Sequence, residues 1–116
     1  MDVRLFHITT REEFEAARAS GEDYRPAAYA REGFIHCSYG HQVARTAARH
    51  FAGRADLILL EIDRAALTCA VVDENLSGGA ELFPHVYGPL PVAAIIAMRP
   101  FSGLPPGPAE AGRHDS

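Results

Sequence analysis

The sequence of 116 residues has little that could cross-link a fold or anchor it in a membrane. Its two cysteines, Cys37 and Cys69, lie in apolar contexts and form no Cys-x-x-Cys pair, which favours buried thiols over a disulfide. The longest apolar run, Val92–Met98, is far shorter than the roughly 20 residues that span a bilayer. The chain starts without a basic segment followed by an apolar run, so we expect no signal peptide and a cytoplasmic protein.

Positive charge is also scarce. The formal net charge is −4, and no basic stripe follows any predicted element. Duplex nucleic acids are bound through many contacts between basic side chains and phosphates, so we expect no duplex partner. A small nucleotide needs only a local patch of charge and stays open as a ligand. With 47% hydrophobic residues, the chain can bury one core without a disulfide or metal. The sequence leaves the oligomeric state open.

The first segments of the chain predict a strand followed by a helix. Residues 3–8 are predicted to form a strand, with Val3, Leu5 and His7 on one face and Arg4, Phe6 and Ile8 on the other. Thr10 and Glu13 have the spacing of a capping box, and the helix that they open is expected to end at Gly21.

A second strand and helix are predicted next. Residues 33–37 form a short strand whose alternation places Phe34 and His36 on the same face. Ser38 is expected to cap a helix over residues 40–51, which carries an apolar stripe.

The second half of the chain consists mostly of predicted strands. Leu57–Ile62 is an almost continuous apolar run, typical of a central strand buried on both faces. Val71–Glu74 forms a short strand, and Pro91–Phe101 closes the sheet. Glu81–Pro89 is rich in Pro, Gly, aromatic and ionisable residues, which predicts a rigid loop that holds a site.

The mixed order of these elements predicts an α+β fold rather than a doubly wound sheet. We expect one domain over residues 1–101. Residues 102–116 are rich in Pro and Gly and poor in apolar side chains, which predicts a disordered tail.

Histidines and carboxylates are the candidate functional groups. His7 and His36 lie near strand ends that lead into helices, where free backbone N–H groups favour anions, and His85 lies in the predicted loop. An imidazole in an apolar strand needs a partner, so each is either a bonded core residue or part of a site. We expect all three to line one cleft with Tyr87 close by. The other histidines, at positions 41, 50 and 114, are expected to be ordinary surface histidines or bonded core histidines.

Either Glu74 or Glu81 could orient an imidazole or stabilise a cationic transition state, and either could instead be a solvated loop carboxylate. Zinc is not expected, because the histidine and cysteine spacings of known local zinc sites are absent from the sequence. Ser38 close to His36 does not predict a hydrolase, because no Gly-x-Ser-x-Gly motif is present.

Four segments together resemble a known family. They are Phe6–Thr10, Gly33–Ser38, Leu57–Asp63 and Phe83–Leu90. On these segments the chain resembles the small bacterial proteins of the domain of unknown function 952 family, over about residues 3–101. That family's pattern has a Glu on the strand before the Phe-Pro-His block, and Glu74 matches it.

The family's fold is similar to that of ADP-ribosyltransferases and RNA 2′-phosphotransferases. The resemblance therefore implies a mixed or antiparallel split sheet with two short helices, and NAD or an ADP-ribose-like nucleotide as ligand. In those enzymes a first-strand His, here His7, binds the adenine-side ribose, and a late carboxylate stabilises the oxocarbenium-like transition state. The residues expected to bind the nucleotide are His7, Thr9, Ser38 and Tyr87, and those expected to act in catalysis are His36, Glu74 and His85.

The sequence departs from those enzymes at the second strand, where Ile35-His36 replaces the usual Tyr. Two functions therefore stay open. One is an enzyme that transfers an ADP-ribose-type group to an acceptor, and the other is a non-catalytic module that binds a nucleotide or small metabolite in the same pocket.

Overall fold

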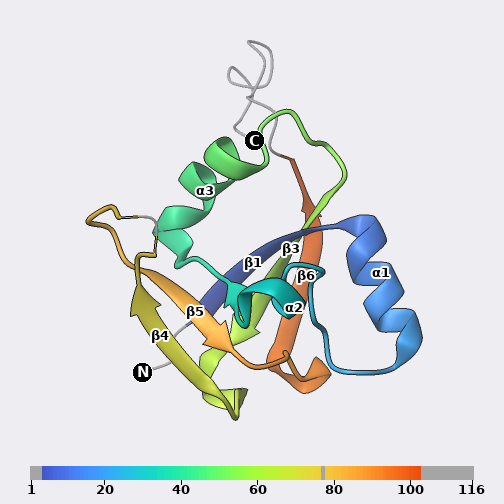
Figure 1. Cartoon of the computed structure of the whole chain (residues 1–116). Coiled ribbons are helices and arrows are strands. Elements are labelled where there is room, and N and C mark those ends of the chain that lie inside the picture. The colour runs from blue at the N-terminus through green and yellow to red at the C-terminus, as the bar shows by residue number, and fades with distance from the viewer. Residues whose placement is uncertain (1–3, 77, 103–116) are drawn as a thin grey trace.

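The computed structural model describes residues 4–76 and 78–102, so the tail predicted over residues 102–116 lies outside the described residues except for its first residue. The strands form two antiparallel sheets of three strands each, with orders β1-β3-β6 and β2-β5-β4 (Figure 1). This confirms an α+β fold with antiparallel sheets. Within the described residues, every helix is too short or too polar to cross a membrane.

The elements have the following bounds. The first sheet contains β1 (Arg4–Thr10), β3 (Leu57–Asp63) and β6 (Ile95–Phe101), and the second contains β2 (Ile35–His36), β4 (Ala70–Glu74) and β5 (Phe83–Tyr87). The helices are α1 (Arg11–Ser20), the single turn α2 (Tyr29–Glu32) and α3 (Val43–His50). Shorter 3₁₀ turns cover Gly40–Gln42, Arg64–Ala66 and Val92–Ala94.

Within residues 4–76 and 78–102, the two sheets meet through a single backbone bridge. The Phe6 amide donates to the Ser38 carbonyl at 2.8 Å, and the Ser38 amide donates back to Phe6 at 2.7 Å. The bridge links β1 of the first sheet to the chain just after β2 of the second. The sheet is therefore split, since beyond this bridge each half pairs only with its own strands.

Strand β3 is buried on both faces, as its apolar run predicts. Ile58, Leu60 and Ile62 pack into the main core. That core also takes residues from the second sheet, among them Ile35 and Val86. The alternate β3 residues lie in a smaller cluster under α3, whose buried members are Ile8, Ala47, Leu57 and Leu59. The main core therefore joins both sheets into one unit.

The ends of helix α1 follow the sequence signals only in part. Thr10 Oγ1 accepts a hydrogen bond from the Glu13 amide at 3.1 Å, and Gly21 closes the helix with a φ of 75°. The capping box is wrong in its second half, because the Glu13 carboxylate accepts from the Ala27 amide and the Thr9 hydroxyl instead. Glu13 therefore ties α1 to the segment before α2.

The predicted cap of the next helix is also wrong. The Ser38 hydroxyl lies 3.0 Å from Thr46 Oγ1 and caps no helix. The chain first makes the 3₁₀ turn after Tyr39, and α3 begins at Val43. The backbone of Ser38 pairs with Phe6 and its hydroxyl with Thr46, and Tyr39 is the residue that precedes the first turn.

The predicted rigid loop is wrong as well, because Phe83–Tyr87 is the central strand of its sheet. Proline is rare in such strands because it has no N–H to donate. The Pro84 carbonyl accepts from the Cys37 amide at 3.1 Å. A strand residue directs its backbone N and C=O to the same side. The nitrogen of Pro84, which has no hydrogen to donate, therefore faces the end of the two-residue strand β2. The hydrogen bonds between β5 and β4 are not affected.

Both cysteines are free thiols, as expected. Cys37 is buried in the main core, and the half-buried Cys69 packs against it. Burial raises the pKa of the Cys37 thiol, so this side chain behaves as a small hydrophobic residue.

Candidate functional site

A cleft of about 870 Å³ lies between the two sheets and is lined by residues of β1, α2, α3 and the second sheet. All three predicted histidines line it, together with Thr9, Ser38 and Glu74, while Glu81 is not among its lining residues. Tyr87 does not line the cleft but contacts Glu74. The structure therefore brings the three histidines together and, of the two predicted carboxylates, places Glu74 rather than Glu81 at the cleft, which Glu13 and Glu32 also line.

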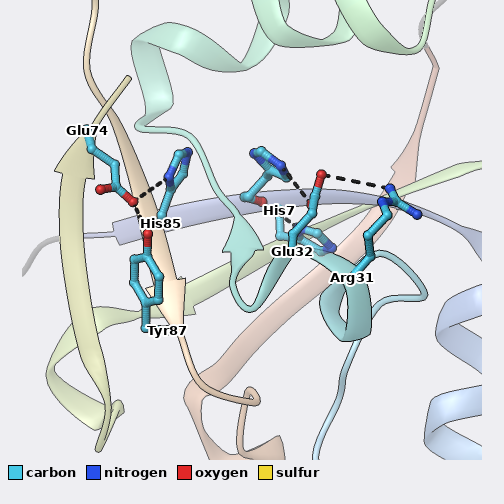
Figure 2. A network of polar contacts seen from close by, with 7 residues as sticks. His7, Arg31, Glu32, Glu74, His85 and Tyr87 are labelled. Atoms are coloured by element: carbon cyan, nitrogen blue, oxygen red, sulfur yellow. Dashed lines mark hydrogen bonds and ion pairs between the residues drawn. The ribbon is translucent and has the colours of Figure 1, made fainter. Parts of the chain in front are cut away.

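Glu74, His85 and Tyr87 form a hydrogen-bonded group on one wall of the cleft (Figure 2). His85 Nδ1 lies 2.9 Å from Glu74 Oε2, and the Tyr87 hydroxyl donates to the same oxygen. These hydrogen bonds lower the pKa of Glu74, the one from Tyr87 most, so the carboxylate stays ionised at neutral pH. Glu74 Oε1 has no hydrogen-bond partner among the described residues.

The ring of His85 has a fixed orientation. It is only 4% exposed and stacks on Phe34, with ring centroids 4.3 Å apart and an interplanar angle of 15°. Because a carboxylate only accepts, Glu74 places the proton of a neutral imidazole on Nδ1. In that tautomer Nε2 is the nitrogen without a proton, and it has no hydrogen-bond partner in residues 4–76 and 78–102.

His36 lies directly opposite His85 in the β2–β5 ladder, and their ring centroids are 5.0 Å apart. Its Nε2 lies 3.0 Å from Glu32 Oε1, and the side chain is 58% exposed at the mouth of the cleft. Glu32 in turn lies 3.8 Å from Arg31 (Figure 2). Partial desolvation lowers the pKa of His36, Glu32 opposes this, and nearby His85 lowers it further.

His7 is held by the fold at both ring nitrogens. Nδ1 lies 2.7 Å from the carbonyl oxygen of His36, and Nε2 lies 3.0 Å from the Tyr24 hydroxyl. The Tyr24 oxygen is also 2.9 Å from Thr9 Oγ1. Burial lowers the pKa of His7, so the ring is neutral, with its proton on the nitrogen that faces the carbonyl. His7 thus fixes β1 against β2 and has no ring nitrogen left for a ligand.

Several cleft residues escaped the sequence reasoning. Helix α3 contributes Arg45, Thr46, Arg49 and His50, and α2 contributes Arg31 and Glu32. Arg45 is bonded to Glu81 at 2.7 Å, whereas Arg49 has no ion pair or hydrogen bond within the described part of the chain. The spacing of Arg45 and Arg49, one turn apart beside the apolar stripe of α3, is the signal that could have placed both at the cleft.

Candidate metal ligands do not cluster here. Among the described residues, no three His, Cys, Asp or Glu side chains are grouped closely enough to hold a metal ion. The absence of zinc stays a prediction, which elemental analysis of the purified protein would test.

Comparison with known proteins gives one family and close structural relatives. A family model described as "Protein of unknown function (DUF952)" matches residues 8–98. The crystal structure of protein CC0527 from Caulobacter crescentus is similar, with a TM-score of 0.73 and 36% identity over 84% of each chain. The solution NMR structure of the same protein has a TM-score of 0.72 and 36% identity over 85% of this chain and 84% of that one. No curated protein matches the chain.

Proposed function

Since the chain belongs to the DUF952 family of proteins of unknown function, we propose its function from the cleft: it binds NAD or a related ADP-ribose-containing nucleotide and transfers the ADP-ribosyl group to an acceptor. The proposal follows from the similarity of fold to ADP-ribosyltransferases that the resemblance to this family implies. The observation that carries it is Glu74, an ionised carboxylate in a nucleotide-sized cleft with one oxygen free of partners among the described residues.

The size and lining of the cleft support a nucleotide ligand. Its volume of about 870 Å³ falls within the usual range for small-molecule sites, about 300–1,000 Å³. Phe6, Phe34 and Phe51 contribute aromatic side chains to the lining, which suit a flat base or nicotinamide ring. Polar groups lie among them, as in sites that bind an amphipathic ligand.

Two arginines at the cleft suit the phosphates of such a ligand. Arg49 lies on α3 without a partner in the described part of the chain, and Arg31 lies on α2. The ion pair of Arg31 with Glu32 is long, at 3.8 Å, and exposed, so it holds Arg31 only weakly. A guanidinium can bind two phosphate oxygens at once, which makes arginine a strong phosphate ligand.

Glu74 suits the bond-breaking step. When the bond between nicotinamide and ribose breaks, positive charge develops on the ribose, and a fixed carboxylate stabilises it. The hydrogen bonds from Tyr87 and His85 hold Glu74 in place and keep it ionised. Tyr87 therefore acts through Glu74 in this proposal.

The other residues expected to bind the nucleotide are assigned to shaping the cleft. His7 has protein partners at both nitrogens. The Thr9 and Ser38 hydroxyls are bonded to Glu13 and Thr46, respectively. In this proposal they set the positions of β1, α1 and α3 around the ligand.

Binding and turnover test the proposal separately. We expect NAD or ADP-ribose, but not inorganic phosphate alone, to raise Tm. At a ligand concentration of about 100 times Kd, binding should raise the free energy of unfolding by about 2.7 kcal/mol. Glu74→Gln should keep nucleotide binding, measured by isothermal titration calorimetry, and lose the release of nicotinamide from NAD. Glu12→Gln, the same change at an exposed residue outside the cleft lining, is the matched control and should alter neither.

Two results would change the conclusion. If neither NAD nor ADP-ribose binds, the proposal is wrong. If they bind but wild-type protein releases no nicotinamide, the cleft belongs to a non-catalytic binding module.

A further inference from the structure

Besides the exposed His50 on α3, the cleft is lined by His7, His36 and His85, which use their ring nitrogens differently. Both nitrogens of His7 have protein partners, and His36 is paired with Glu32 at the exposed mouth of the cleft. His85 is nearly fully buried, yet only Nδ1 has a partner in the described residues. Nε2 is not among the fully buried polar atoms that lack a partner, so this nitrogen is accessible from the cleft and open to a ligand on a ring that is otherwise buried.

The surroundings of His85 prevent its ring from satisfying that nitrogen by rotation. Phe34 stacks on one face, Glu74 holds Nδ1, and His36 packs edge-on at 5.0 Å. Turning the ring over would break the bond to Glu74 without giving Nε2 a carboxylate. The titratable groups that face the imidazole are thus Glu74 and His36, with Tyr87 and Glu32 one bond further away.

We propose that His85 Nε2 is the general base of the transfer and that the acceptor is a neutral hydroxyl group small enough to enter the cleft. This inference rests on the proposed function. Glu74 Oε2 orients the imidazole, while the opposite oxygen of the same carboxylate faces the developing positive charge. One carboxylate then serves both the donor and the acceptor.

The transfer step balances without any oxidant or reductant. The acceptor oxygen bonds to the anomeric carbon of the ribose as the bond from that carbon to nicotinamide breaks, and the electron pair leaves with nicotinamide. The hydroxyl proton moves to His85 Nε2. The resulting imidazolium is stabilised by Glu74 at 2.9 Å until the proton passes to solvent.

The chemistry of the acceptor follows from the need for a base. A hydroxyl group is a weak nucleophile until its proton is taken, so it gains most from a fixed imidazole. A thiol, with a pKa of about 8.5, ionises without such help. An alkyl amine is already cationic at neutral pH, and it would have to approach Arg31 and Arg49 at the same cleft.

The test compares two histidines of the same chain. His85→Gln should lower nicotinamide release by about 100- to 10,000-fold, the usual contribution of a general base, while NAD still binds. His41→Gln, an exposed histidine outside the cleft lining, should keep the wild-type rate. With ethylene glycol as probe acceptor, wild type should form the glycol adduct of ADP-ribose and His85→Gln should not. His85→Asn serves as a second variant if His85→Gln misfolds by circular dichroism.

A readout without NAD separates this inference from the proposed function. Nitrogen-15 NMR of the wild-type imidazoles should place the His85 proton on Nδ1 at neutral pH, with Nε2 unprotonated. A proton on Nε2, or wild-type turnover in His85→Gln, would overturn the general-base assignment. Failure of NAD to bind wild type, with the Nδ1 tautomer present, would instead reject the nucleotide and leave the open base in place.

Discussion

The partners of a histidine decide what happens when it is replaced. His7, His36 and His85 line the same cleft, but His7 holds two strands together and His36 lies in an exposed ion pair. His85 alone among them combines deep burial with an open ring nitrogen in the described structure. Substitutions should therefore have different effects on stability and on function at each position.

The pH dependence of the free energy of unfolding should reflect the protonation of His7. Because burial lowers its pKa in the folded state below the unfolded value of 6.5, the unfolded chain binds this proton more readily. The free energy of unfolding therefore has its full value above the unfolded pKa of His7. It decreases as the pH falls below that pKa, by up to about 1.4 kcal/mol per pH unit.

His7→Asn tests this linkage. Its amide can still donate to the His36 carbonyl, so the variant should fold with lower stability at neutral pH. Its free energy of unfolding should then fall less steeply than that of wild type between about pH 7 and 5. Urea denaturation across that range measures both slopes, and equal slopes would show that His7 does not titrate as described.

Burial predicts a second contrast, between Leu59 and His36. Leu59 is 7% exposed in the cluster under α3, so Leu59→Ala should lower the free energy of unfolding by about 2–5 kcal/mol through a cavity. His36→Ala removes an exposed ion pair but keeps the backbone carbonyl that His7 uses, so it should cost less than about 1 kcal/mol. Chemical denaturation compares them, and equal losses would make His36 a structural residue.

At the scale of elements, the sequence correctly predicted those features that depend on neighbouring residues alone. The cap at Thr10, the stop at Gly21 and the apolar run of β3 each depend on a few adjacent residues, and each was correct. Strand β5 was missed because Pro84 argues against a central strand. Its strand conformation depends on pairing with β4 and on the early end of β2, which no local pattern contains.

The candidate site was predictable to a similar extent. The expectation that His36 and His85 line one cleft is confirmed, although His85 lies in strand β5 rather than in the predicted loop, and Glu32 was missed. Gly33, with a φ of 82°, turns the chain between α2 and β2 and so returns Glu32 to His36. The distinct bonding of the histidines also could not be predicted, because it depends on contacts between distant segments.

The junction of β4 and β5 gives a prediction at this scale. A Cβ at Gly88 would lie 2.6 Å from Cys69 Cβ, just beyond the last pair of the ladder. Gly88→Ala should therefore push β5 away from the segment that enters β4, at a cost of about 1–3 kcal/mol. Cys69→Gly removes the clashing atoms, so Gly88→Ala should cost less in that background. A double-mutant cycle in urea measures this, and simple additivity would show that the contact is not the cause.

At the scale of the whole molecule, the split sheet raises the question of whether its halves unfold separately. A single backbone bridge, between Phe6 and Ser38, joins their strands. The main core, however, contains fully buried residues of both sheets, including Leu60 from β3 and Val86 from β5. Neither sheet can lose its strands without exposing the apolar surface of the other.

We therefore expect one cooperative unfolding transition despite the split sheet. The chain has four tyrosines and no tryptophan, and Tyr24 is only 2% exposed between α1 and the cleft, so tyrosine fluorescence reports the packing of the core. Its urea transition should coincide with that of far-ultraviolet circular dichroism. Amide hydrogen exchange should give Leu60 and Val86 the same opening free energy, equal to the global value, because both depend on one core. A lower value at Val86 alone would mean that the second sheet opens by itself, and with it the wall of the cleft that carries Glu74 and His85.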